Sequence, residues 1–140
     1  IKATVIPDGF FVLDTGDHHY INFLEVDLGT ETGRSSKFGR RDFARKIMAY
    51  LAYYESGLYA KKYDPNEEYK HFTKRVMTVT TGPKRLANLK SISEDAGAGN
   101  QFWFTTFDQV SPETVLNRSI WEIASRDGLS PLVWLDEQGE

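Results

Sequence analysis

The amino-acid sequence predicts a mixed α/β fold in which a central sheet is flanked by helices. Two runs of aromatic and β-branched residues, 9–14 and 20–28, predict paired strands. Apolar residues at spacings of three and four predict a long helix from Phe38 to about Tyr59. Further strands and helices then alternate along the chain. Strands separated by helices need crossover connections, which give a mixed sheet.

The first two strands are joined by the turn-like segment DTGDHH and form a predicted hairpin. Side chains alternate along a strand, so Ile21, Phe23, Glu25 and Asp27 share one face of the second strand. The opposite face also carries apolar residues. We therefore expect this strand to be covered on both sides and to lie inside the sheet.

Four further segments complete the predicted fold. Residues 75–81 and 101–107 read as strands, and a helix between them begins near Pro83 and ends at Gly97. Residues 111–124 are either a short helix or an irregular loop, and 131–135 resemble a final edge strand. The elements are expected to form a single domain over residues 1–140, the C-terminal part of a longer protein, because the chain begins at Ile1 in strand-like sequence.

Composition limits the chemistry that the chain can perform. The 140 residues are 40% hydrophobic, which is enough for a core, and include no cysteine, which removes disulfides and thiolate chemistry. No phosphate-cradle or serine-hydrolase motif is present. The sequence shows neither a spanning apolar run nor a signal peptide, so we expect a cytoplasmic protein without a membrane partner.

Three carboxylates could form a metal site at one end of the sheet. A four-residue turn in the hairpin would place Asp8 opposite Glu25, on the face that also carries Asp27, whereas a three-residue turn would place Asp8 on the other face. Clustered carboxylates repel unless a cation intervenes, and oxygen ligands suit Mg²⁺ or Mn²⁺. The alternative is that all three are solvated surface charges.

Lys46 is predicted to lie on the flank of the long helix with Tyr50 and Tyr53, where it can turn toward these carboxylates. There it would neutralise them or stabilise a developing negative charge on a phosphate. The alternative is an ordinary surface lysine whose stem packs on the protein.

The segment RSSKFGRRDFARK predicts a local basic surface in a chain whose net charge is −3. DNA contacts are assigned to Arg34, Lys37, Arg40, Arg41 and Arg45. The alternative is a solvated helix face. Tyrosines of the same helix, at positions 50, 53, 54 and 59, offer a surface for a homodimer or protein partner, although core packing explains at least Tyr54 equally well.

The strings IPDGFFVL, FLEVDLGTET, ARKIMAYLAYY and RVMTVTTGPKRLANL occur in this order and spacing over residues 5 to about 107. This combination resembles the bacterial plasmid replication-relaxation family, whose members look like relatives of the PD-(D/E)XK restriction-endonuclease superfamily. The resemblance implies a restriction-endonuclease-like sheet of four strands, whose first core helix would lie upstream of Pro7 and outside this chain.

By this resemblance, Asp8 matches the PD aspartate and Glu25 the acidic residue of the (D/E)XK motif, and both would bind Mg²⁺ or Mn²⁺. Asp27 stands where the superfamily has its catalytic lysine. Helix geometry makes Lys46 the candidate for a lysine supplied from the following helix; if no lysine reaches the site, Asp27 would become a third metal ligand or the site would have lost catalysis. Glu31 is a further acidic candidate. The implied function is a metal-dependent endonuclease acting on DNA. The alternative is a catalytically inactive module that binds DNA or a protein.

Overall fold

The computed structural model describes residues 6–16, 18–29, 36–68 and 71–134, and these form a mixed α/β arrangement around one sheet. In chain order its elements are β1 (Gly9–Asp14), β2 (His18–Val26), α1 (Ser36–Glu55), α2 (Leu58–Tyr63), β3 (His71–Thr80), α3 (Pro83–Asp95), β4 (Phe102–Thr106), the short 3-10 helix η1 (Phe107–Gln109), β5 (Trp121–Ile123) and β6 (Leu129–Ser130). The sheet order is β1-β2-β3-β4-β5-β6.

The sheet is mixed because β2, β3 and β4 are parallel while β1, β5 and β6 are antiparallel to their neighbours. In the first hairpin, Phe10 lies opposite Phe23 and Asp14 opposite His19. This is the register that a four-residue turn predicts. The pairing puts the beginning of β1 beside the end of β2, where the predicted carboxylates lie.

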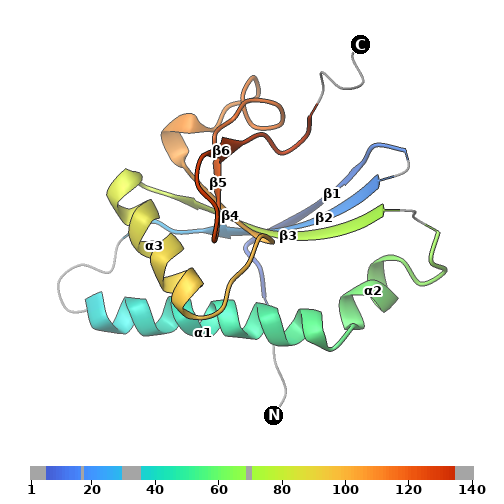
Figure 1. Cartoon of the computed structure of the whole chain (residues 1–140), viewed down its shortest axis with the longest axis horizontal. Coiled ribbons are helices and arrows are strands. Elements are labelled where there is room, and N and C mark those ends of the chain that lie inside the picture. Colours follow the sequence, from blue (N-terminus) through green and yellow to red (C-terminus); the bar gives the residue numbers. More distant parts are fainter. Residues whose placement is uncertain (1–5, 17, 30–35, 69–70, 135–140) are drawn as a thin grey trace.

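Helices α1 and α3 cover one face of the sheet, as Figure 1 shows. The apolar side of α1 packs on β2, so that Ile47 and Tyr50 share a buried cluster with Ile21 and Phe23. Helix α3 adds Leu89 to the same cluster. The spacing of apolar residues in both helices thus produces the expected helix layer.

The C-terminal segment covers the opposite face of the sheet, above the strands in Figure 1. Met77 and Val79 of β3 pack there with Trp121 and Leu132. Residues 75–80 of β3 are all buried, because alternate side chains enter the two cores. The inner strands β2 and β3 are therefore covered on both faces, as the sequence predicted for β2.

Two sequence predictions about elements are wrong. The long helix is divided at Gly57, whose φ of 76° lies in the left-handed region, so α1 ends at Glu55 and α2 begins at Leu58. The described residues of the expected strand 131–135 are not in a strand, and β6 precedes them at Leu129–Ser130. Pairing of β5 and β6 also makes the sheet six strands wide, whereas the family resemblance implied four.

The segment 111–124 consists of turns followed by the three-residue strand β5. The loop alternative is therefore the better of the two predictions, although neither included a strand. Over the described ranges, no helix has the length and the apolar character needed to cross a membrane.

Candidate carboxylate site

The hairpin positions Asp8 and Glu25 at one end of the sheet. The Asp8 backbone N–H donates to the Leu24 carbonyl oxygen at 2.9 Å, and the Val26 N–H donates to Asp8 Oδ2 at 2.8 Å. These two bonds extend the β1-β2 pairing by one residue and fix the Asp8 side chain beside the end of β2. Asp8 is exposed, whereas Glu25 is 3% exposed and faces α1.

Lys46 and Tyr50 hold the Glu25 carboxylate from α1. Lys46 Nζ donates to Glu25 Oε1 at 2.8 Å, and the Tyr50 hydroxyl donates to Glu25 Oε2 at 2.5 Å. The two donors are four residues apart, so they lie one above the other on the same side of the helix. The structure thus brings Lys46 to Glu25, and the catalytic role of Lys46 stays a prediction. Its side chain is 45% exposed, so this ion pair reaches solvent at its lysine end.

Tyr50 remains a hydrogen-bond donor because its pKa is raised well above the ordinary value of 10.0. Burial is the main cause, followed by the hydrogen bond to Glu25 and the negative charge of that carboxylate. The charge of Asp8 contributes in the same direction. The negative charges of Glu25 and Asp8 thus both act on the Tyr50 hydroxyl.

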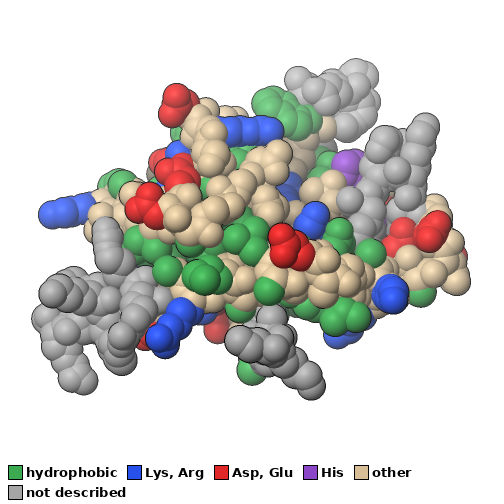
Figure 2. Space-filling view, turned by 60° about the horizontal axis from the view of Figure 1, so that its bottom comes forward, with side chains coloured by type: hydrophobic (Ala, Val, Ile, Leu, Met, Phe, Trp, Pro, Cys, Tyr) green, Lys and Arg blue, Asp and Glu red, His purple; other side chains and the backbone are tan. Residues whose placement is uncertain are grey.

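A cavity of about 370 Å³ opens beside this group. It is lined by Ile6, Glu25, Asp42, Arg45, Lys46, Ala49 and Tyr50. Arg45 and Asp42 are exposed on α1, and Figure 2 shows basic and acidic side chains interspersed with apolar ones on this side of the molecule. The cavity therefore gives access to Glu25, which is otherwise buried.

Asp27 lies on the predicted face but has partners of its own. Arg85, in the first turn of α3, donates to Asp27 Oδ2 at 2.8 Å and to Oδ1 at 2.9 Å, and Thr80 Oγ1 donates to Oδ2 at 2.6 Å. Burial opposes ionisation, but the hydrogen bonds and charge of Arg85, with help from Thr80 and the Gly29 backbone, lower the pKa of Asp27. Both oxygens of this carboxylate are engaged within the protein.

The expected third metal ligand is therefore an ion-pair partner in this structure. Helix α3 begins directly after β3, beside the end of β2, and so brings Arg85 to Asp27. Within the residues that the structure describes, no group of three or more histidine, aspartate or glutamate side chains is arranged to hold a metal ion. Asp8 and Glu25 remain as two carboxylates at this end of the sheet, and binding of a metal ion by them stays a prediction.

The structure does not describe the side chains of most of the predicted DNA-binding residues. Glu31 and Arg34 lie outside the described residues, and the side chains of Lys37, Arg40 and Arg41 are not described. Arg45 is exposed and lines the cavity beside Lys46. The assignment of DNA contacts to the start of α1 stays a prediction.

The chain has a family match. Residues 1–68 match the family model described as Replication-relaxation. This match supports the resemblance to replication-relaxation proteins, and its range includes Asp8, Glu25 and Lys46 but ends before β3. No curated protein and no solved structure matches the chain. The relationship of replication-relaxation proteins to the PD-(D/E)XK nucleases stays a prediction.

Sequence reasoning missed two functions of side chains at this end of the sheet. Tyr50 was assigned to a helix flank or a partner surface, yet it is 1% exposed and binds Glu25. Its spacing of four from Lys46 was the available signal. Tyr54 is also in the core, and Tyr53 and Tyr59 pack against it, so all four tyrosines contribute to packing within the chain. Nothing near Arg85 in sequence identified its partner.

Proposed function

We propose that this chain is a DNA-processing domain acting in plasmid replication or relaxation, with a divalent-metal-dependent phosphodiesterase centre at Asp8, Glu25 and Lys46. The observation that carries the proposal is the 2.8 Å contact of Lys46 Nζ with Glu25 beside Asp8 at one end of the sheet. The match to the Replication-relaxation family model supports the plasmid context, and its range includes all three residues.

The donor set fits a hard divalent ion. Asp8 and Glu25 offer only oxygen ligands, which suit Mg²⁺ or Mn²⁺. Asp8 is exposed, and Oδ1 accepts no hydrogen bond within the described part of the chain, so this oxygen is available to a cation. When bound, such an ion would activate water and stabilise charge on phosphate oxygens. Asp27 is left out of the proposed centre because the Arg85 guanidinium binds both of its oxygens, whereas Lys46 contacts Glu25 at one oxygen only and is 45% exposed.

The other roles in the proposed centre fall to two side chains of α1. Tyr50 holds one Glu25 oxygen and so fixes the direction of the carboxylate. Lys46 places a positive charge at the opening of the cavity, where the scissile phosphate would lie. Its partial exposure allows the ammonium group to exchange Glu25 for a phosphate oxygen as negative charge develops there.

A second candidate is a nuclease-like module that binds DNA or a protein without cleaving it. Both Glu25 oxygens accept hydrogen bonds, and Asp27 occupies the position of the superfamily's lysine. In this alternative, Lys46 and Glu25 form a structural ion pair. Such a module would bind independently of chelator, with a salt dependence set by its phosphate contacts.

Nicking of supercoiled plasmid in Mg²⁺, Mn²⁺ or chelator distinguishes the two candidates. We expect metal-dependent nicking that falls by about 10²-fold or more in Glu25→Gln and Lys46→Met, because each removes a group acting on the charge of the transition state. Glu55→Gln, an exposed change at the end of α1, is the matched control and should retain activity.

Circular dichroism of each variant separates loss of chemistry from loss of fold, and calorimetric titration with Mn²⁺ reports ion binding directly. Nicking by Glu25→Gln at the wild-type rate would contradict the proposed centre. Chelator-insensitive DNA binding without nicking would favour the binding module.

A further inference from the structure

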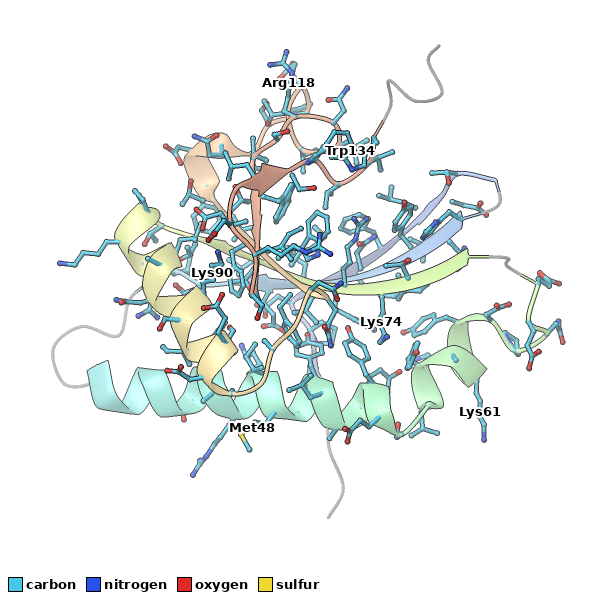
Figure 3. All side chains as sticks on the ribbon, viewed as in Figure 1. Met48, Lys61, Lys74, Lys90, Arg118 and Trp134 are labelled. Atoms are coloured by element: carbon cyan, nitrogen blue, oxygen red, sulfur yellow. The ribbon has the colours of Figure 1, made fainter. Side chains whose placement is uncertain are left out.

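A second cavity, of about 450 Å³, lies against the sheet face opposite α1. Its lining comes from β2, β3, β4 and the C-terminal segment, and includes Tyr20, Arg75, Trp103, Arg126 and Trp134. Figure 3 places Trp134 above the sheet, whereas Lys74 lies below it. The size is that of cavities that bind small molecules. This cavity is separate from the Glu25 site because the sheet lies between them.

Arg75 is a buried cation in the wall of this cavity, with 2% of its surface exposed. Its Nε donates to Asn22 Oδ1 at 2.9 Å, and its Nη1 donates to the Leu132 carbonyl oxygen at 2.9 Å. Its Nη2 is buried and has no hydrogen-bond partner among the described residues. One of the three guanidinium nitrogens thus has no hydrogen-bond partner in the described part of the chain, which is costly in a buried setting.

Two aromatic rings lie close to the guanidinium group. Its carbon lies 4.4 Å from the centre of the Tyr20 ring and 4.8 Å from that of Trp103, and these residues belong to the strands on either side of β3. With a ring on the strand to either side, the partnerless Nη2 is the part of the group at which a further ligand would bind. An oxyanion binds a guanidinium edge in this way.

The charge of Arg75 has no acidic counterpart in the described lining of the cavity, which contains no aspartate or glutamate. Burial lowers the pKa of Arg75 to about 10, so the group is still positively charged at neutral pH. Arg126 adds a second, exposed cation. Lys74 does not join them, because its Nζ lies over the rings of Tyr54 and Tyr59 on the other side of the sheet.

We propose that this cavity binds a nucleoside monophosphate, with a phosphate oxygen on Arg75 Nη2 and the base against the half-exposed indole of Trp134. The phosphate supplies the anion that the buried cation lacks, and the base supplies a flat ring that stacks on an aromatic side chain. The same chemistry is offered by a free nucleotide and by the 5′-phosphorylated end of a DNA strand. The proposal goes beyond the phosphodiesterase centre and requires no metal.

Calorimetric titration in chelator with AMP, adenosine and inorganic phosphate tests the proposal. We expect saturable binding of AMP, and binding of adenosine and phosphate each weaker by about tenfold or more, because each lacks half of the contacts. Titration with a short single strand, with and without a 5′-phosphate, distinguishes the two sources. Binding of either phosphorylated form supports the proposal.

Substitutions of residues that line the cavity test whether AMP binds there. Trp134→Ala and Arg126→Gln should weaken AMP binding by about fivefold or more, because the first removes the ring on which the base stacks and the second removes a cation near the phosphate. Phe107→Ala and Arg118→Gln, both at exposed positions outside the cavity lining, are the matched controls. Arg75→Lys retains the charge but removes the edge donors, and should bind AMP weakly if it folds.

If Arg75→Lys fails to fold, Trp134→Ala and Arg126→Gln, which change exposed residues, still test the proposal. Three results would overturn the proposal: no saturable binding of AMP or of the phosphorylated strand, adenosine binding as tightly as AMP, or unchanged AMP affinity in both Trp134→Ala and Arg126→Gln. Because chelator is present throughout, loss of the metal-dependent centre leaves this measurement unaffected.

Discussion

Glu25 and Asp27 lie two positions apart near the end of β2, yet their partners come from different helices. Glu25 binds Lys46 and Tyr50 of α1, while Asp27 binds Arg85 of α3. The side chain of Glu25 is 4% exposed and that of Asp27 is 14% exposed, so both charges depend on protein partners. The same strand face therefore contributes one carboxylate to the cavity and one to an internal ion pair.

The Asp27 ion pair predicts a specific response to acid. The pKa of Asp27 is lowered, so its contribution to the free energy of unfolding is complete above the ordinary value of 3.8 and is lost as the pH falls below it. Asp27→Asn should cost about 2 kcal/mol at pH 7, because hydrogen bonds to a charged group are lost. Urea denaturation at pH 7 and pH 3 measures both effects.

In that experiment the wild type should lose more stability between pH 7 and pH 3 than Asp27→Asn loses. Asp95→Asn, at an exposed position at the end of α3, controls for general effects of removing a carboxylate. Equal losses in the wild type and Asp27→Asn would show that the ion pair does not contribute to acid sensitivity.

Part of this site could be predicted from the sequence, for physical reasons. Strand alternation placed Glu25 with Ile21 and Phe23, and helix geometry placed Lys46 on the flank that meets Glu25. Both arguments use local periodicity. The contact between Arg85 and Asp27 joins residues 58 positions apart and depends on where α3 begins relative to β2, which no local pattern contains.

Among the elements, the break between α1 and α2 is the main departure from the predicted helix. Apolar spacing continues from Tyr54 to Leu58, so periodicity alone predicts one helix. Leu58 is nevertheless 56% exposed, and Gly57 turns the chain so that Tyr63 of α2 stacks on Phe10. The turn thus brings α2 to the edge strand β1.

Substitution of Gly57 tests the need for this turn. Gly57→Ala should lower the free energy of unfolding by about 1 kcal/mol, because alanine is disfavoured in the left-handed region. The space around the position is open, so no steric contact contributes to the cost. Gly57→Asn should cost less, since asparagine tolerates this conformation. Thermal denaturation of the wild type and the two variants measures the order of their stabilities. An alanine variant as stable as the wild type would contradict the need for a left-handed residue at position 57.

At the scale of the whole molecule, β3 holds the two cores together. It pairs with β2 on one side and β4 on the other, and its side chains alternate between the two buried clusters. The sequence predicted the inner strands from their β-branched and aromatic residues. It did not predict β6, which has two residues, and β5 has three. Strands this short carry no periodic signal, and their pairing depends on packing of the C-terminal segment.

Hydrogen exchange should follow this organisation. We expect the slowest amide exchange in residues 75–80 of β3, because these amides are buried and lie between two paired strands. Helix α2, which has no fully buried residue, should exchange much faster. Exchange measured by NMR reports both. Protection in α2 equal to that in β3 would contradict this order of local stability.

The family match ends at residue 68, one strand short of the partner that β2 needs. A protein made only of the matched part would leave the nine residues of β2 with a row of unpaired backbone groups along one side. Here β3, which lies beyond the matched range, supplies the strand that pairs with β2. In this chain the matched half therefore depends on the sequence after it to close its sheet, and a truncation at residue 68 would expose the free edge of β2.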